Sequence, residues 1–187
     1  MDEIDYSQLT HYAKAFTGLT EEREKLLVEA GPAIKPSLQD VTERFYDTLQ
    51  SIDKTAPFLE GRLDSLKKTH QVWLEGLFSG PFDEQYTQSM YHVGQVHVKV
   101  GLPVEFMSGG MSLIADQLTA LIFDTYRDHP QQGPALLRAL NAVMGFSLLV
   151  MQQSYQSSSL AAELERFLAI TGMSRNLFEN LASAYHN

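Results

Sequence analysis

The sequence contains no cysteine, and this absence excludes several kinds of site at once. Without thiolates the chain forms no disulfides, zinc–thiolate sites or iron–sulfur clusters. Any metal must be held by His, Met, Tyr or carboxylate side chains. The range of metal centres and cofactors open to this chain is therefore narrow.

Basic residues and long apolar runs are scarce as well. The 14 Lys and Arg residues face 23 Asp and Glu, which gives a formal net charge of −9 and disfavours a nucleic-acid surface. No run of 18 or more apolar residues appears, and the acidic start is unlike a signal peptide. At 187 residues we expect one cytoplasmic domain with some surplus, which binds neither nucleic acid nor membrane.

Apolar residues recur at steps of three and four along most of the chain, which predicts an all-α protein of seven or eight helices. Capping residues and Gly/Pro breaks suggest where the helices begin and end. We expect helices from Thr20 to the Gly31-Pro32 break, from Pro36 through Leu49, from Arg62 to Phe78, from Asp83 across His97, from Leu102-Pro103 through Phe123, and from Gly133-Pro134 through Met151 and past Leu164.

One segment also fits a strand, because Val96, Val98 and Val100 alternate with polar residues. The surrounding periods are all close to 3.6, and no partner strand with hairpin residues is visible. We therefore interpret the segment as helical.

His97 is the most informative residue of this segment. In a helix, Tyr86, Met90, Val93, His97 and Val100 fall on one apolar stripe, with the imidazole in its middle. An imidazole in such surroundings needs a partner, which can be a backbone carbonyl, a buried carboxylate or a metal. The spacing alone favours an ordinary core histidine with its hydrogen bonds made.

Several short segments follow one another along the chain in a specific order and spacing. They are Phe45-Tyr46 with Leu49, Leu66-Lys67, Trp73-Leu74, Leu77-Phe78, Val93-Gly94-Gln95-Val96-His97 and Gly101-Leu102-Pro103. Taken together, these segments resemble the sensor globin domain of bacterial globin-coupled sensors. The resemblance spans about residues 20 to 155 and implies a globin fold with an N-terminal extension and a long C-terminal helix.

The resemblance implies that His97 is the proximal ligand of haem b, iron protoporphyrin IX, through Nε2. It also implies that Tyr46 is a distal hydrogen-bond donor to bound O₂ and that Leu66 shapes ligand access; each of these two residues can instead be plain core packing. The further residues expected to line the haem are Phe45, His70, Trp73, Val93, Val96, Val100, Phe106 and Met107.

His70 allows two roles, since it lies one turn beyond Leu66 on the same stripe. It can ligate the iron in the resting state, or line the pocket and offer a second hydrogen bond. We favour pocket lining over ligation. A His70→Leu spectrum with unchanged resting bands would exclude ligation.

The last helix suggests how the domain is used. Leu160, Leu164, Phe167 and Leu168 prolong it beyond the matched region, after a polar patch at 152–159 that we expect to be solvated or weakly packed. We expect residues 1–158 to form the haem-binding sensor globin and residues 159–187 a helical linker or the start of a middle or output domain. The resemblance implies a homodimer through the last two helices and a C-terminal output module, such as a diguanylate cyclase or histidine kinase.

The predicted function is a haem-based gas sensor with O₂ as the main ligand and CO and NO as further ligands. No phosphate loop, nucleophile motif, cyclase motif or kinase motif is present, so we expect no enzyme activity in this chain. Two alternatives stay open: a haem-free globin-fold interaction module, and a globin with peroxidase or dioxygenase activity.

Overall fold

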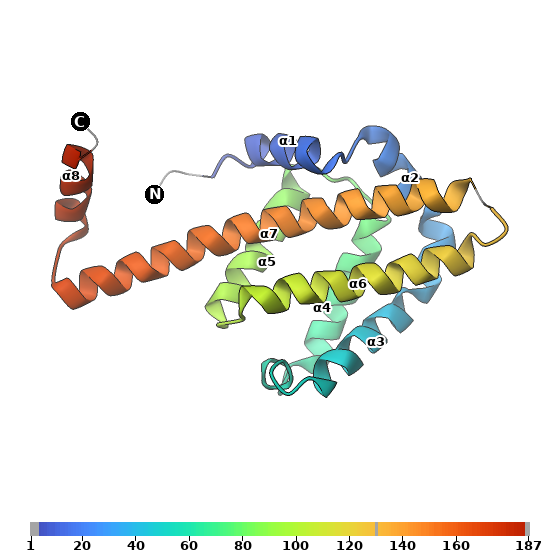
Figure 1. Ribbon diagram of the computed structural model, residues 1–187, viewed down its shortest axis with the longest axis horizontal. Helices are drawn as coiled ribbons and strands as arrows, with labels where there is room; N and C mark the ends of the chain where they lie inside the picture. Colours follow the sequence, from blue (N-terminus) through green and yellow to red (C-terminus); the bar gives the residue numbers. More distant parts are fainter. Residues whose placement is uncertain (1–3, 130, 186–187) are drawn as a thin grey trace.

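The computed structural model describes residues 4–129 and 131–185, and every regular element within them is a helix (Figure 1). The all-α prediction is confirmed, and residues 96–99 lie in a helix as interpreted from the sequence, not in a strand. The helices are α1 (Tyr6–Thr17), α2 (Glu21–Ile34), α3 (Leu38–Ser51), α4 (Leu63–Leu77), α5 (Glu84–Lys99), α6 (Val104–Thr125), α7 (Gln132–Thr171) and α8 (Arg175–Tyr185), with 3₁₀ turns at Lys35–Ser37 and Ala56–Phe58.

Short polar side chains begin several helices, as the sequence indicates. The Thr20 hydroxyl accepts a hydrogen bond from the backbone N–H of Arg23, at 3.4 Å. The Asp83 carboxylate accepts from the N–H groups of Gln85 and Tyr86, at 3.0 and 3.1 Å. Such caps satisfy N–H groups that have no partner within the first turn, so they fix where each helix starts.

The predicted end of α2 at Gly31-Pro32 is wrong, because the helix continues to Ile34. Pro32 lies in the last turn, where its missing N–H costs only one helical hydrogen bond. Gly31 is buried against another segment, and a Cβ at this position would lie 2.7 Å from the carbonyl oxygen of Phe78. Gly31 is therefore a glycine of close packing rather than a helix break.

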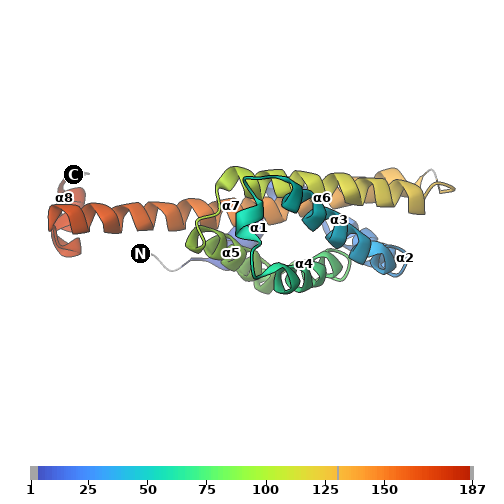
Figure 2. The same cartoon turned by 90° about the horizontal axis from the view of Figure 1, so that it is seen from below.

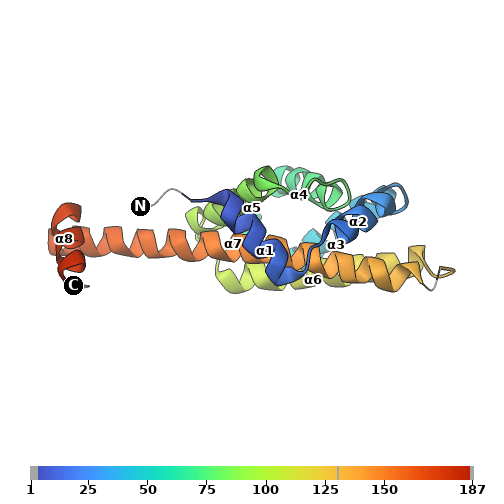
Figure 3. The same ribbon diagram turned by 90° about the horizontal axis from the view of Figure 1, so that it is seen from above.

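Helix α7 is the central helix of the fold and packs against α1, α2, α5 and α6 (Figures 1 and 3). Helix α3 packs against both α4 and α6. Seen from below, α3, α4, α5 and α6 surround the middle of the molecule (Figure 2). Helices α4 and α5 follow each other in the chain but pack little against one another.

A continuous core fills the space between these helices. Its largest fully buried side chains are worth roughly 1.5–3 kcal/mol each through the removal of apolar surface from water. They are Phe78, Phe82, Phe146, Leu27, Ile34, Leu38, Leu74, Leu77, Leu118, Ile122, Val143 and Val150.

Two helices, α6 and α7, are long and apolar enough to cross a membrane by length and composition. Both are packing helices of this fold, and 56% of the most apolar window of α7 is buried inside the molecule, against 28% for α6. Core packing accounts for most of the apolar character of α7. The exposed positions of α6 are mostly small or polar, and its exposed large apolar side chains are Val104 and Phe123.

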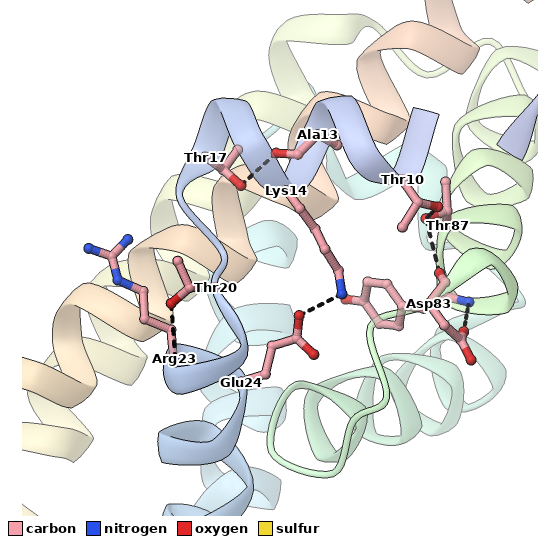
Figure 4. A network of polar contacts seen from close by, with 10 residues as sticks. Thr10, Ala13, Lys14, Thr17, Thr20, Arg23, Glu24, Asp83 and Thr87 are labelled. Atoms are coloured by element: carbon pink, nitrogen blue, oxygen red, sulfur yellow. Dashed lines mark hydrogen bonds and ion pairs between the residues drawn. The ribbon is translucent and has the colours of Figure 1, made fainter. Parts of the chain in front are cut away.

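The N-terminal helix α1 is fastened to the start of α5 by the network in Figure 4. The hydroxyls of Thr10 and Thr87 lie 2.6 Å apart, and the Thr87 hydroxyl donates to the carbonyl of Asp83 at 3.0 Å. An ion pair of 2.6 Å joins Lys14 to Glu24 of α2. The N-terminal extension is thus an integral part of the helical body.

Candidate functional site

The C-terminal turn of α5 holds His97 in a fixed backbone position. Its carbonyl accepts the N–H of Leu102 at 2.9 Å, and the carbonyl of Val98 accepts the N–H of Gly101 at 3.0 Å. Gly101 has a φ of +70°, which glycine adopts at little cost. This is a Schellman motif, and it explains the Gly101-Leu102 sequence directly after the histidine helix.

The imidazole of His97 is half-buried and makes no hydrogen bond within the described part of the chain. Its Nδ1 is buried without a partner, so neither the carbonyl nor the carboxylate considered from the sequence is present there. Burial lowers the pKa of His97, and the ring is neutral at pH 7. A neutral imidazole with an unshared nitrogen lone pair can ligate a metal.

Apolar side chains beside His97 are only partly covered. Val93 is half-buried, whereas Val96 and Val100 are 41% and 37% exposed. Met90, earlier on the predicted stripe, is buried in the core. The stripe therefore leaves the core towards the end of α5 and presents apolar surface next to the imidazole.

An aromatic cluster lies on α3 and α4. The rings of Phe45 and His70 are stacked with centroids 4.8 Å apart, and Tyr46 meets His70 edge-on at 5.6 Å. Trp73 lies one turn further along α4, 5.7 Å from the His70 ring. Four of the residues predicted to line one pocket are thus brought into direct contact.

Hydrogen bonding defines the state of His70. Its Nδ1 lies 3.2 Å from the Thr42 hydroxyl, which itself donates to Oε1 of Gln71 at 3.0 Å. Because the Thr42 proton is used there, the hydroxyl accepts from Nδ1–H of His70. Burial lowers the pKa of His70 to about 4, and its Nε2 is buried without a partner in the described chain. Neutral His70 therefore offers a free Nε2 lone pair.

Among the described residues, no hydrogen bond of the Tyr46 hydroxyl is found. Tyr46 itself is buried, and burial raises its pKa to about 12. The phenol is protonated at pH 7 and is available as a donor to a group that enters the site.

Further residues predicted to line the haem lie on α6 and on the N-terminal half of α4, near the aromatic cluster. Met107 is buried and Phe106 is half-buried, with its ring 6.0 Å from that of Phe58. A Cβ at Gly110 would lie 3.5 Å from the Phe45 ring, so α6 passes close to the aromatic cluster. Leu66 is half-buried on α4, one turn before His70.

The donor set excludes a conventional multi-ligand metal site. No group of three or more His, Asp or Glu side chains that could hold a metal ion occurs in the part of the chain that the structure describes. A metal here must bring most of its ligands with it, as a porphyrin does, and needs one or two imidazoles from the protein. The sparse packing between α4 and α5 is compatible with a flat group between them.

Residues 7–160 match the family model described as Protoglobin. The chain belongs to the protoglobin family. Among curated proteins, this protoglobin is similar to the heme-based aerotactic transducer HemAT of Halobacterium salinarum, with 25% identity over 132 residues. That match covers 68% of this chain and 27% of the transducer, so the chain spans about a quarter of the length of this relative.

Solved structures agree with this assignment. The globin domain of a globin-coupled sensor from Geobacter sulfurreducens matches with a TM-score of 0.73 and 29% identity, covering 78% of this chain and 96% of that one. The ferric globin domain of DosC from E. coli matches with a TM-score of 0.66 and 18% identity, covering 78% of this protoglobin and 99% of that chain, which supports the fold alone. The predicted resemblance and the predicted globin fold are confirmed. The family match begins at residue 7, so it includes α1.

Sequence reasoning missed Thr42 as a partner of the site. It fixes which nitrogen of His70 carries the proton, although it lies 28 residues away on another helix. No spacing rule connects the two positions. Only the packing of α3 on α4 reveals the contact.

Proposed function

We propose that this protoglobin binds haem b with Nε2 of His97 as the axial ligand and acts as a haem-based gas sensor. The observation that carries the proposal is His97 itself: a neutral, half-buried imidazole without a protein partner, at the end of a helix fixed by a Schellman motif. Haem iron supplies reversible binding of O₂, CO or NO. Membership in the protoglobin family supports this cofactor.

The apolar residues of the site would cover the porphyrin and keep water away from it. His97 is flanked by Val93 and Val96 on α5 and by Val100 directly after this helix. Covering the exposed side chains of Val96 and Val100 would remove apolar surface from water and so favour binding. On the other helices, the covering side chains would be Phe45, Leu66, Trp73, Phe106 and Met107.

Tyr46 would act on the bound gas. Its protonated hydroxyl can donate a hydrogen bond to the partly negative oxygen of bound O₂. CO carries less charge and gains less from such a donor. Tyr46 therefore favours O₂ as the physiological ligand.

The Nε2 lone pair of His70 can accept a hydrogen bond or ligate the iron, but it cannot donate to a bound gas in this tautomer. A second hydrogen bond from His70 to the bound gas is therefore left out of the proposal. Two roles remain for His70, which are pocket lining and coordination of the resting iron. The absorption bands of His70→Leu separate them: unchanged resting bands indicate lining, and a loss of six-coordinate bands indicates coordination.

We further propose a two-part organisation, with the sensor globin in residues 1–158 and a helical linker or the start of an output domain in residues 159–187. The relative HemAT is named an aerotactic transducer, and this chain covers 27% of it. In our proposal a cytoplasmic homodimer formed through α6 and α7 passes the ligand state to an output module. The chain itself acts as the sensor and not as an enzyme.

An absorption spectrum of the purified protein tests the cofactor. We expect a Soret band in the ferric and ferrous forms that shifts with O₂, CO and NO, and its loss in His97→Ala. His92→Ala is the matched control, because His92 is exposed on the same helix. A colourless protein after hemin reconstitution, or an identical Soret band in His97→Ala, overturns the proposal; the colourless result would instead support a haem-free interaction module.

Turnover separates the remaining alternative from a sensor. A peroxidase or dioxygenase would consume peroxide or NO well above the rate of free haem. We expect rates close to that of free haem.

A further inference from the structure

A chain of hydrogen bonds joins three helices on one side of the aromatic cluster. The indole N–H of Trp73, on α4, donates to the hydroxyl of Tyr86, on α5, at 3.3 Å. The Tyr86 hydroxyl lies 2.8 Å from the hydroxyl of Ser147, on α7. Ser147 donates to the carbonyl of Val143 at 2.9 Å.

The donor of each bond follows from chemistry. An indole N–H can only donate, so the Tyr86 oxygen accepts from it. The Ser147 proton is used on the Val143 carbonyl, so Ser147 accepts the proton of Tyr86. Every polar hydrogen of the Trp73, Tyr86 and Ser147 side chains has an acceptor. The three hydrogen bonds all run in one direction, from Trp73 to the Val143 carbonyl, and we call them the hydrogen-bond relay.

Packing holds the middle of this relay in place. The Tyr86 ring meets Phe82 at 5.2 Å and Phe146 at 5.8 Å, and Ser147 is fully buried. A phenol in such surroundings has few rotamers open to it. The Tyr86 hydroxyl is thus a fixed acceptor for the indole.

The relay also reaches the candidate gas site. Trp73 contacts His70, which in turn contacts Phe45 and Tyr46. Helices α4 and α5 otherwise pack little against each other. The Trp73 to Tyr86 bond is therefore a defined link between the helix of His70 and the helix of His97.

We propose that Tyr86 is a positioning residue for the gas-binding site: its hydroxyl fixes the Trp73 indole and, through that ring, the His70 imidazole and the separation of α4 from α5. This inference rests on the proposed haem-based function. It assigns a role to Tyr86 and Ser147, which do not themselves touch the gas.

The test compares the haem-loaded full chain with Tyr86→Phe, which removes one oxygen and keeps the packed ring. Tyr91→Phe is the matched control, because Tyr91 is buried on the same helix and, among the described residues, accepts a side-chain hydrogen bond only through its backbone carbonyl, from Ser154. Trp73→Phe and the double variant Trp73→Phe/Tyr86→Phe complete a double-mutant cycle.

The single tryptophan of the chain gives a direct readout. In the CO complex, which is diamagnetic, it gives one indole N–H resonance. We expect Tyr86→Phe to shift that resonance and to speed its exchange with D₂O, and to change the O₂ dissociation rate by about three- to tenfold, as the loss of one buried hydrogen bond allows. Tyr91→Phe should change neither, and Tyr86→Phe should add nothing in the Trp73→Phe background.

Three results overturn the proposal: an unchanged indole resonance in Tyr86→Phe, an O₂ dissociation rate equal to that of Tyr91→Phe, or the full rate effect persisting in the Trp73→Phe background. If Tyr86→Phe does not fold, Ser147→Ala takes its place, and we expect it to shift the indole resonance and to change the O₂ dissociation rate. A wild-type protein without a Soret band would overturn the proposed function as well, whereas a normal Soret band with unchanged rates overturns this inference alone.

Discussion

At the level of single residues, burial sets the protonation states at the site. It lowers the pKa of both His70 and His97 and raises that of Tyr46. All three groups are neutral at pH 7. In the proposed haem site they would therefore add no net charge, which suits a neutral diatomic gas better than an anion.

Tyr46→Phe should speed O₂ dissociation by about 10- to 100-fold, since a hydrogen bond to a charged or partly charged acceptor is worth roughly 1.5–3 kcal/mol. The CO dissociation rate should change little, because bound CO carries less negative charge. Stopped-flow and flash-photolysis measurements give both rates. Equal changes for the two gases would contradict a donor role of the Tyr46 hydroxyl.

His70 should make stability depend on acid pH. Its pKa is about 4 in the folded protein and about 6.5 in the unfolded chain, so the unfolded state binds more protons between these values. The free energy of unfolding therefore rises with pH between about 4 and 6.5. On acidification, the part of the stability that depends on neutral His70 is fully lost near pH 4. His70→Leu should flatten the slope of urea midpoints between pH 4 and 6.5.

His92→Leu is the control for this measurement, because His92 is exposed. Release of haem by protonation of His97 is open to all three proteins, because each of them keeps His97. A slope in His70→Leu as steep as in the wild type would show that His70 does not carry the dependence.

Sequence reasoning found His97, Tyr46 and His70 because an apolar period and a family resemblance place them. Their roles stay predictions. It did not find Thr42 or Tyr86 as partners, since each acts across a helix–helix contact between positions far apart in the chain. Periodicity predicts which face a residue occupies and not which residue of another helix faces it.

At the level of elements, α5 is joined to α7 at residues 151–155. A Cβ at Gly94 would lie 2.6 Å from the Met151 carbonyl, so the two helices touch there. The Ser154 hydroxyl donates to the Tyr91 carbonyl at 2.5 Å, and the Tyr155 hydroxyl donates to the Leu102 carbonyl. The helix that carries His97 is therefore packed closely against α7 towards its C-terminal end.

Gly94→Ala should destabilise the fold by about 1–3 kcal/mol, because the clash is with a backbone oxygen that cannot rotate away. It should also displace the end of α5 and change the ligand kinetics. Gly109→Ala is the matched control, since Gly109 lies in α6 and a methyl group added there would meet no other side chain. There we expect a gain of roughly 0.5–1 kcal/mol.

Urea unfolding followed by circular dichroism measures both variants. Equal stability of Gly94→Ala and the wild type would show that α5 and α7 are not tightly packed at this point.

Helix bounds were largely predictable, because Thr20, Asp83 and Pro103 mark helix starts through local chemistry. The end of α2 was not, since the role of Gly31 depends on Phe78 from another segment. The polar patch at 152–159 was expected to be solvated, yet Ser154 is fully buried there. Its hydroxyl is paired across the helix contact, a context that composition does not show.

At the scale of the whole molecule, α7 extends well beyond the helical body and leads to α8 (Figure 1). The projecting part carries apolar side chains that the described chain leaves open, among them Leu160 at 60% and Ile170 at 85% exposed. Phe123, near the end of α6 that leads into the start of α7, is also exposed. Exposed large apolar side chains on helices favour an interface, and a second copy supplies the same helices.

Leu160→Glu/Ile170→Glu should therefore convert a dimer into a monomer, because two carboxylates per chain would have to be buried at the helical interface. Sedimentation velocity measures the change, and the Soret band should persist, since both residues lie on the projecting part of α7. Ser157→Glu is the control on the same helix, at an exposed polar position.

If the ligand state is passed through this dimer, the monomeric variant should also bind O₂ with a different affinity, because a ligand shifts the balance between two arrangements only when it binds them unequally. A wild-type monomer, or a variant that stays dimeric with unchanged affinity, would place the interface elsewhere.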